Sequence, residues 1–358
     1  MNNLYALGWD ASFETHFQSY SDQGLIPARI AIEQRSLYQV MGEEGSLTAR
    51  CSGRFLHHIA DRASMPTVGD WVAVDRKTGT DQVDIQAVLP RRSEFSRAAA
   101  GRQTSQQIIA ANIDTVFLVT GLDHNFNLRR IERYLTVARE SGADPVIVLN
   151  KADLCPDTEV RRAEVEAVAR GVPVTATSAV TGHNFDEIQL FMRPGKTVAL
   201  LGSSGVGKST LVNRLLGQEI QDTGPARIDD GRGRHTTTTR NLFVVPTGGI
   251  LIDTPGLREI GLWETDVDQT FDDLVDLASR CRFSNCNHDG EPGCAIREAV
   301  KTGALDPGRL TNWRKLQREQ AFAIRQQDEA SKRRYASAWK QITTQTRQKN
   351  RFEERDQD

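Results

Sequence analysis

A glycine-rich octapeptide, Gly202 to Ser209, has the residue types and spacing of a polyphosphate-binding loop. Its sequence GSSGVGKS matches G-x-x-x-x-G-K-[ST] and lies between the apolar run KTVALL and the helix-like run STLVNRLL. Glycines let the backbone wrap phosphate oxygens, and successive N–H groups point at them from a helix start. We expect Lys208 to reach the β- and γ-phosphates and the Ser209 hydroxyl to bind Mg²⁺. The expected nucleotide contacts of this loop are Gly202, Ser203, Ser204, Gly205, Val206, Gly207, Lys208, Ser209 and Thr210.

A second polar motif, Asn150-Lys151-Ala152-Asp153, closes the apolar run PVIVL. The Asp153 carboxylate can accept hydrogen bonds from both the N1–H and the 2-amino group of guanine, a pair that adenine does not offer. We expect Asn150 to orient the loop and contact the base, and the stem of Lys151 to pack over the ring. Alone, the motif also fits a polar turn; beside a phosphate-binding loop it favours guanine nucleotides.

Two further loops follow apolar runs. After GGILI comes Asp253-Thr-Pro-Gly256, where we expect Asp253 to hold Mg²⁺ through a water and the Gly256 N–H to meet the γ-phosphate. D-x-x-G is common by chance, so this interpretation depends on its position downstream of the phosphate-binding loop. After VPVTA come Ser178 and Ala179, which we expect to support the guanine through main-chain N–H groups.

The segment GRGRHTTTTR, residues 231–240, lies between the phosphate-binding loop and Asp253. Leu257 stands where GTPases of the Ras type carry the glutamine that orients the attacking water, so we expect slow intrinsic hydrolysis. With Lys208 and Asp253, His235 completes the expected catalytic set, because an imidazole can position a water near neutral pH. Alternatively, another molecule supplies that group. Four threonines are candidates for binding Mg²⁺, and the sequence does not choose among them: Thr236, Thr237, Thr238 and Thr239.

Three of the five cysteines lie within fourteen residues, in the pattern Cys281-x4-Cys286-x-His288-x5-Cys294. Three thiolates and one imidazole satisfy a tetrahedral Zn²⁺, and no ligand is missing, so we expect one structural zinc ion per chain. Buried free cysteines beside a surface histidine are the plainer alternative. The remaining cysteines, Cys51 and Cys155, are isolated, and the odd total does not suit a disulfide framework.

The composition describes a water-soluble globular chain of 358 residues, 38% hydrophobic and 26% charged, with a formal net charge of −2. Any nucleic-acid surface must therefore be local. No apolar run approaches the roughly 20 residues that span a bilayer, and MNNLYALGWDASFETHF has no secretory pattern. We expect a cytoplasmic, monomeric protein with no membrane partner.

The positioning elements change character along the chain. Residues 1–24 are polar with scattered aromatics and predict a loosely held arm or a short helix. Residues 25–100 contain five short strand-like runs, namely ARIAIEQ, LYQVMG, LTARCSG, DWVAVD and VDIQAVL. They predict an OB-fold-like β-barrel, favoured about two to one over other small barrels, followed by a basic joint.

Residues 101–261 alternate apolar strands with helical runs, which predicts a mostly parallel sheet covered on both faces. Residues 262–358 hold the Cys/His cluster and a helical tail. From Arg309 onward that tail carries 13 Lys or Arg against 7 Asp or Glu. The predicted fold class is therefore multi-domain: a β-barrel, an α/β nucleotide-binding domain and a zinc-binding helical domain.

The order of the motifs is unusual. In Ras-like GTPases the phosphate-binding loop precedes N-K-x-D and S-A, whereas here Asn150 and Ser178 precede Gly202. A circular permutation accounts for this, because a sheet depends on which strands are neighbours and not on chain order.

The run TVGDWV, the N-K-A-D motif, GSSGVGKST, GRGRHTTTT, DTPG-x-R-E and the Cys/His cluster together resemble the RsgA (YjeQ) family of circularly permuted GTPases. The resemblance covers essentially the whole chain and is weakest in the first 25 residues and beyond about Thr311. It implies a GTP hydrolase that acts in late assembly of the small ribosomal subunit and is stimulated by that subunit. GTP, Mg²⁺, one zinc ion and ribosomal RNA are the implied ligands.

Two other functions stay open on the residues alone. One is an RNA-binding module whose nucleotide site is only a sensor, which the intact Lys208, Ser209 and Asp253 disfavour. The other is a P-loop kinase or ATPase, which the N-K-A-D motif disfavours. The candidate RNA contacts are Arg91, Arg92, Arg97 and Arg102 in the joint and Lys332, Arg333 and Arg334 in the tail, each of which also fits a solvated basic face.

Overall fold

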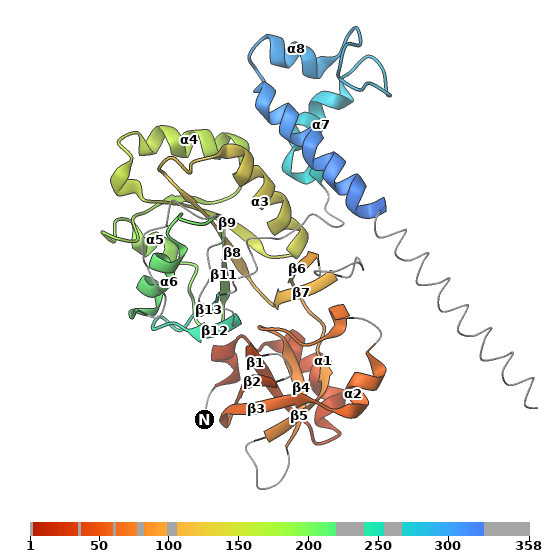
Figure 1. The fold of residues 1–358 in the computed structure, drawn as a ribbon, viewed down its shortest axis with the longest axis vertical. Coiled ribbons are helices and arrows are strands. Elements are labelled where there is room, and N and C mark those ends of the chain that lie inside the picture. The colour runs from red at the N-terminus through yellow and green to blue at the C-terminus, as the bar shows by residue number, and fades with distance from the viewer. Residues whose placement is uncertain are drawn as a thin grey trace, which may run out of the picture.

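The computed structural model describes residues 3–34, 37–59, 62–76, 82–98, 106–219, 240–253 and 267–325. These residues form a β-barrel, an α/β domain and a helical C-terminal region (Figure 1). Several predicted residues lie outside the described ranges: Arg102, His235, Thr236, Thr237, Thr238, Thr239, Gly256, Leu257, Lys332, Arg333 and Arg334.

The N-terminal segment is a packed helix, so the helical alternative predicted for it is confirmed. A short 3-10 turn, Leu4–Leu7, precedes α1, Ala11–Ser21, whose first N–H groups are capped by the Asp10 carboxylate. Phe13 and Phe17 face the barrel and form an aromatic cluster with Trp9 and Trp71. Burial of these rings holds the segment against the barrel.

Five strands form the barrel, and they coincide with the five predicted runs: β1 Ile26–Gln34, β2 Leu37–Gly42, β3 Gly45–Cys51, β4 Trp71–Arg76 and β5 Gln82–Val88. The strand order is β1-β2-β3-β5-β4, and pairing of β4 with β1 closes the barrel. A short helix, α2 (Gly53–His58), follows β3, which is parallel to β5. This confirms the predicted OB-like barrel.

The basic joint contains an antiparallel hairpin of β6, Glu94–Ala98, and β7, Gln106–Ala111, which the sequence analysis did not predict. Arg91 and Arg92, expected to contact RNA, both bind other residues of the protein, but only Arg91 is mostly buried, whereas Arg92 is 42% exposed. Arg91 donates to both carboxylate oxygens of the buried Asp70 at 2.8 Å. Arg92 binds Asp10 and lies over the Phe13 ring. Arg91 is therefore a structural residue, and the expectation for it was wrong.

Within the described residues, the α/β domain contains six strands: β8 Thr115–Gly121, β9 Asp144–Asn150, β10 Val174–Ala176, β11 Thr197–Leu201, β12 Arg240–Val244 and β13 Ile250–Asp253. Their order is β10-β9-β8-β11-β13-β12, and all pairings are parallel except that of β12 with β13. This confirms the predicted mostly parallel sheet.

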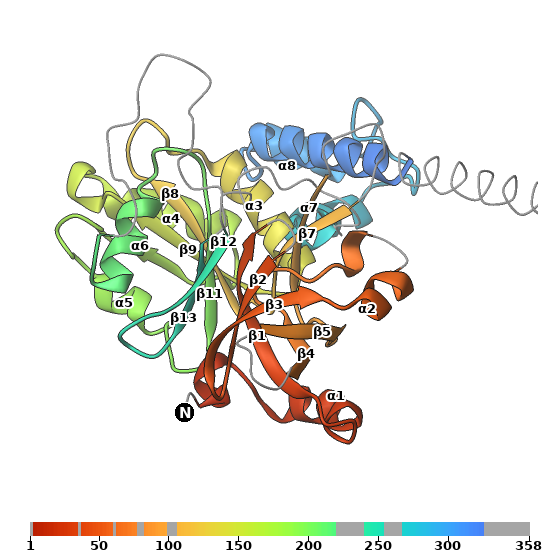
Figure 2. The same cartoon turned by 60° about the horizontal axis from the view of Figure 1, so that its bottom comes forward.

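Helices cover both faces of this sheet, and alternate strand residues point to each (Figure 2). On one face Leu118 and Ile147 pack with α3, Leu128–Ser141, and α4, Thr158–Val168. On the other face the neighbouring strand residues pack with α5, Phe185–Gln189, and α6, Lys208–Leu216. Continuous apolar strands are the sequence signature of this double burial.

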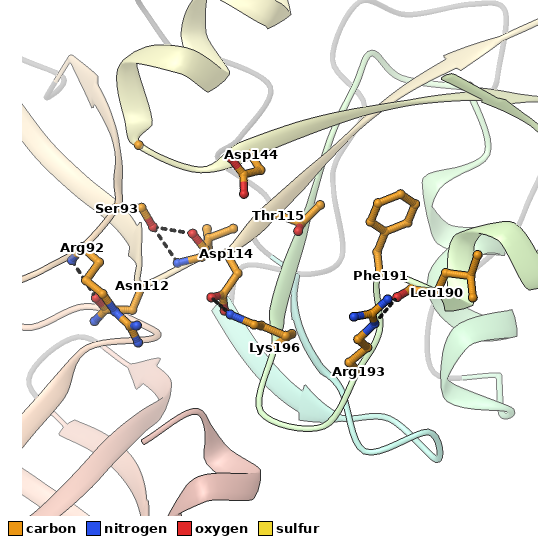
Figure 3. Close-up of a pocket in the computed structure, with 12 residues that line it drawn as sticks. Arg92, Ser93, Asn112, Asp114, Thr115, Asp144, Leu190, Phe191, Arg193 and Lys196 are labelled. Carbon is orange, nitrogen blue, oxygen red and sulfur yellow. Dashed lines mark hydrogen bonds and ion pairs between the residues drawn. The ribbon is translucent and has the colours of Figure 1, made fainter. Parts of the chain in front are cut away.

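The barrel and the α/β sheet are joined edge to edge. Strand β12 pairs antiparallel with β1, so one sheet, with eleven strands in the part of the chain that the structure describes, runs through both parts. A cleft of about 590 Å³ lies at the amino ends of β8, β9 and β11, and Arg92 and Ser93 of the joint also line it (Figure 3). Its polar groups bind one another: Asp114 accepts from Lys196, and Ser93 bonds with the backbone of Ile113. The cleft therefore lies between the joint and the α/β domain.

The C-terminal region contains a 3-10 turn, Val267–Thr270, then α7, Asp272–Ser279, α8, Ala295–Lys301, and a helix over residues 307–325. It contacts α3 through a buried polar cluster. Glu132 of α3 is fully buried and accepts from Arg309 at 2.8 Å and from Asn312 at 2.6 Å. Within the described residues, no helix has the length and apolar character needed to cross a membrane.

Candidate nucleotide and metal sites

Three of the predicted loops lie at one edge of the α/β sheet, together with Asp253 at the end of β13. The three loops follow the carboxyl ends of β9, β10 and β11, which run parallel to β13. In the sheet order β10-β9-β8-β11-β13, strand β8 lies between β9 and β11. The phosphate-binding loop follows β11, between β8 and β13 in the sheet, and carboxyl ends of parallel strands are where such sheets bind ligands.

The phosphate-binding loop needs glycine at three positions. Gly205 and Gly207 have φ angles of 79° and 92°, in the left-handed region that favours glycine. A Cβ on Gly207 would lie 2.2 Å from Nδ2 of Asn150, and one on Gly202 would lie 2.4 Å from the Val119 carbonyl oxygen. The loop thus packs closely on its neighbours, with its backbone free to approach a ligand.

Lys208 begins α6, and its ammonium donates to the carbonyl oxygens of Gly202 at 2.7 Å and Ser203 at 2.6 Å. The positive charge is therefore held at the loop, beside the helix N-terminus. Phosphate oxygens are stronger acceptors for an ammonium than neutral carbonyls are. Ser209 and Thr210 follow in the first turn of α6 and are half-buried.

Asn150 connects three loops. Its side chain is almost fully buried; Nδ2 donates to the Val206 carbonyl at 2.9 Å, and Oδ1 accepts from the Ala179 N–H at 3.0 Å. The N-K-A-D, S-A and phosphate-binding loops are thus tied together by one amide group.

Lys151 adds a second link between loops. Its φ of 67° is left-handed, and its ammonium binds Asp123 at 2.6 Å and the Gly205 carbonyl at 2.6 Å. Burial alone would raise the pKa of Asp123, but the hydrogen bonds from Lys151 and the Asn125 N–H outweigh it and lower that pKa. Asp153 lies in the 3-10 turn Ala152–Leu154 and is exposed.

The S-A loop is held mainly by its own backbone. The N–H of Ser178 donates to the His183 carbonyl at 3.1 Å, while that of Ala179 is taken by Asn150. Both N–H groups have partners within the protein here, and the expected support of the guanine by Ser178 and Ala179 stays a prediction. Arg214 of α6 donates to the Ala179 carbonyl at 3.0 Å and supports the loop from the other side.

Three residues of this edge were missed by the sequence analysis: Asp123, Arg130 and Arg214. Asp123 follows β8, so its place after the apolar run TVFLVTGL was a usable signal. Arg130 of α3 donates to the Ser203 hydroxyl at 2.9 Å. No sequence pattern marks Arg130 or Arg214, because their roles depend on how helices pack against the loops.

Asp253 ends β13 and is half-buried. The register places Ile252 beside Ala199 of β11, so Asp253 lies one residue further toward the phosphate-binding loop. On its other side Asp253 is paired with Asn241 of β12. The predicted Mg²⁺ residues Ser209 and Asp253 thus follow neighbouring strands.

The predicted metal ligands also come together. The ligand atoms of Cys281, Cys286, His288 and Cys294 all lie within 4.8 Å of one another. Nδ1 of His288 is 3.5 Å from the sulfur of Cys281 and from that of Cys294, and these two sulfurs are 3.9 Å apart. A tetrahedron with Zn–S of about 2.3 Å and Zn–N of about 2.0 Å has edges of about 3.8 Å and 3.5 Å. The cluster therefore has the dimensions of a four-coordinate metal site.

Comparisons with known proteins agree on one family. The family model described as RsgA GTPase matches residues 88–263. The "Small ribosomal subunit biogenesis GTPase RsgA" of Opitutus terrae is 50% identical over 363 residues, covering 98% of this chain and 99% of the relative. Its namesake from Syntrophotalea carbinolica is 44% identical over 339 residues, with coverages of 92% and 93%.

Solved structures give the same result. The crystal structure of YjeQ from Thermotoga maritima matches with a TM-score of 0.60 and 28% identity, covering 82% of this chain and 97% of that chain. The structure of YloQ, a circularly permuted GTPase, matches with a TM-score of 0.57 and 22% identity, covering 85% and 96%. The latter similarity supports the fold alone.

Proposed function

Because this chain belongs to the RsgA GTPase family, we propose that it hydrolyses GTP to GDP and phosphate as an assembly factor of the small ribosomal subunit. The observation that best supports a GTP-binding site is that three of the predicted loops meet at the Asn150 side chain. The assembly role is supported by relatives of nearly equal length that bear that name.

Guanine specificity is assigned to Asp153. Asp153 lies two residues after Lys151 and its carboxylate is exposed, so it is available to accept from N1–H and the 2-amino group. Asn150 is assigned the positioning of the loop, and Lys151 the packing over the base. Adenine nucleotides would leave the Asp153 carboxylate opposite an acceptor, which disfavours an ATPase.

Phosphate binding and Mg²⁺ are assigned to the neighbouring loops. The Gly202–Thr210 backbone and the Lys208 ammonium would hold the β- and γ-phosphates. Ser209 and Asp253 would hold Mg²⁺, which supplies charge neutralisation when bound. The Gly256 N–H and one of Thr236–Thr239 are assigned to the γ-phosphate, as the resemblance implies.

Hydrolysis needs a group that orients water, because Leu257 cannot hydrogen-bond it. We assign this to His235, with a group from the ribosomal subunit as the alternative. Slow intrinsic turnover is expected from Leu257 under either assignment, and stimulation by the subunit is what the family resemblance implies. An inactive nucleotide sensor is the second candidate function, and the retained Lys208, Ser209 and Asp253 weigh against it.

The metal cluster is assigned one structural zinc ion. Three thiolates and one imidazole favour zinc over harder cations, and four protein ligands leave no open position for chemistry. Cys294 lies at the start of α8, so the ion would tie that helix to the loop carrying Cys281, Cys286 and His288.

Binding to ribosomal RNA is assigned to the barrel, the joint and the basic tail. With Arg91 excluded, the remaining candidates are Arg92, Arg97, Arg102 and the tail residues Lys332, Arg333 and Arg334. Such contacts predict affinity that falls steeply with salt. A monomeric, cytoplasmic protein is the simplest state for this role.

The proposal is tested by measuring release of phosphate from GTP and from ATP, with and without purified small ribosomal subunits. We expect slow GTP turnover, marked stimulation by the small subunit, and little ATP turnover. No stimulation by the small subunit would contradict the assembly role, and equal ATP turnover would contradict the assignment of Asp153.

A further inference from the structure

The barrel and the nucleotide-binding edge share one row of paired strand residues. Ile32 of β1 is paired with Asn241 of β12, which is paired in turn with Asp253 of β13. Neighbouring strands lie about 4.8 Å apart, so two steps place the barrel backbone about 10 Å from that of Asp253. Figure 2 shows β12 between the barrel and the rest of the α/β sheet.

An ion pair lies in the next row. Arg240 of β12 is opposite Glu33 of β1, and Nη1 of Arg240 is 2.7 Å from Oε2 of Glu33. The Thr67 hydroxyl donates to the same carboxylate oxygen at 3.0 Å. The Arg240 and Glu33 side chains are only 12% and 21% exposed, so salt screens this pair less than a surface pair.

Thr67 begins the run TVGDWV, whose backbone is bonded to β1 of the barrel and to β7 of the joint. Its N–H donates to the buried Asp70 carboxylate at 2.9 Å. Two residues later, a Cβ on Gly69 would lie 2.1 Å from the Ala111 carbonyl oxygen of β7, so only glycine fits there. Glu33 and Thr67 therefore hold the start of β12 through their bonds to Arg240.

We propose that Glu33, Thr67 and Arg240 are positioning residues for Asp253, fixing the register of β12 between the barrel and β13. A slip of one residue in that register would turn alternate side chains to the opposite face. The inference rests on the proposed function, because it concerns the same GTPase site.

The strand order predicts which kinetic constant responds. Asp253 and β12 lie at the phosphate side of the site, whereas the base-binding loops follow β9 and β10, beyond β11 and β8. Loss of the ion pair should therefore lower kcat and leave the Kd for GDP nearly unchanged. General destabilisation would move both constants together with the melting temperature.

The test uses the full-length chain with Arg240→Gln, the charge-retaining Arg240→Lys, and Arg162→Gln as a control that breaks the exposed Arg162–Glu166 pair on α4. We expect Arg240→Gln to lower intrinsic and subunit-stimulated kcat about tenfold, with the Kd for GDP within about twofold. Arg240→Lys should recover most of the rate, and Arg162→Gln should match the unmodified protein. Hydrogen exchange of the β12–β13 amides should be faster in Arg240→Gln only.

An unchanged kcat in Arg240→Gln would overturn the proposal, and so would equal losses of kcat and GDP affinity. Should Arg240→Gln not fold, Thr67→Val removes the hydroxyl that donates to Glu33 and accepts from Arg240, at nearly constant volume. This variant should lower kcat about threefold, and an unchanged kcat there would overturn the proposal as well. Intrinsic turnover is measured in every variant. If small subunits do not stimulate the unmodified protein, that result contradicts the ribosomal role, while the positioning proposal is still judged on the intrinsic kcat.

Discussion

Replacement of Asn150 by alanine tests whether its side-chain amide holds the three nucleotide loops together. The change removes the bonds to the Val206 carbonyl and from the Ala179 N–H, which are 2.9 Å and 3.0 Å long. Both backbone groups are buried, and an unsatisfied buried group costs about 1–3 kcal/mol. With partial relaxation, we expect a total loss of about 2–4 kcal/mol, divided between folding and ligand binding.

Most of this loss should appear in nucleotide affinity, because the bound state needs all three loops in one geometry. A loss of about 2 kcal/mol corresponds to about a thirtyfold increase in the Kd for GDP, measured by titration calorimetry. The control is Asn184→Gly, which removes the bond to the Ala176 carbonyl and keeps the left-handed backbone. The control should lower stability slightly and change the Kd less than threefold. If Asn150→Ala also changes the Kd for GDP less than threefold, the Asn150 amide does not organise the nucleotide site.

Three other substitutions test the remaining assignments. Asp153→Asn should weaken GTP binding about ten- to a hundredfold and shift preference toward xanthine nucleotides, which competition titration would detect; intact GTP affinity would refute the specificity assignment. Cys281→Ala or Cys294→Ala should abolish about one equivalent of tightly bound zinc, measured by metal analysis, and unfold the 265–300 region while GDP binding persists; a substoichiometric, exchangeable metal in the unmodified protein would refute the structural role. His235→Ala should leave GTP affinity nearly unchanged and cut stimulated turnover about a hundredfold; normal stimulated turnover with normal subunit binding would point to a group supplied by the ribosome.

Much of the fold could be predicted because its elements are defined by local patterns. The strands of the barrel and the sheet coincide with runs of apolar or alternating residues, and α3 ends at Gly142, whose left-handed φ of 80° suits a helix cap. The hairpin of β6 and β7 was missed because its first strand lies in a polar, arginine-rich stretch. The N-terminal helix was left open as an alternative, since its burial depends on aromatic rings meeting Trp71.

The nucleotide-binding edge could be predicted where residues belong to motifs and not where they depend on packing. Asn150 was expected to orient its loop, but the backbone groups that it binds are set by the neighbouring strands. In the sequence, Arg91 lies in the same basic stretch as Arg92 and Arg97, but in the structure it forms an ion pair with the buried Asp70. Burial raises the pKa of Asp70, while Arg91 acts in the opposite direction. Composition cannot separate such structural arginines from those available to RNA.

The measurement that tests the central claim most directly is GTP turnover at fixed protein concentration across a titration of purified small ribosomal subunits, with large subunits as the control. We predict a saturable rise in the rate of phosphate release with small subunits, no such rise with large subunits, and little hydrolysis of ATP under either condition. A GTPase rate that is the same with and without small subunits would contradict the account.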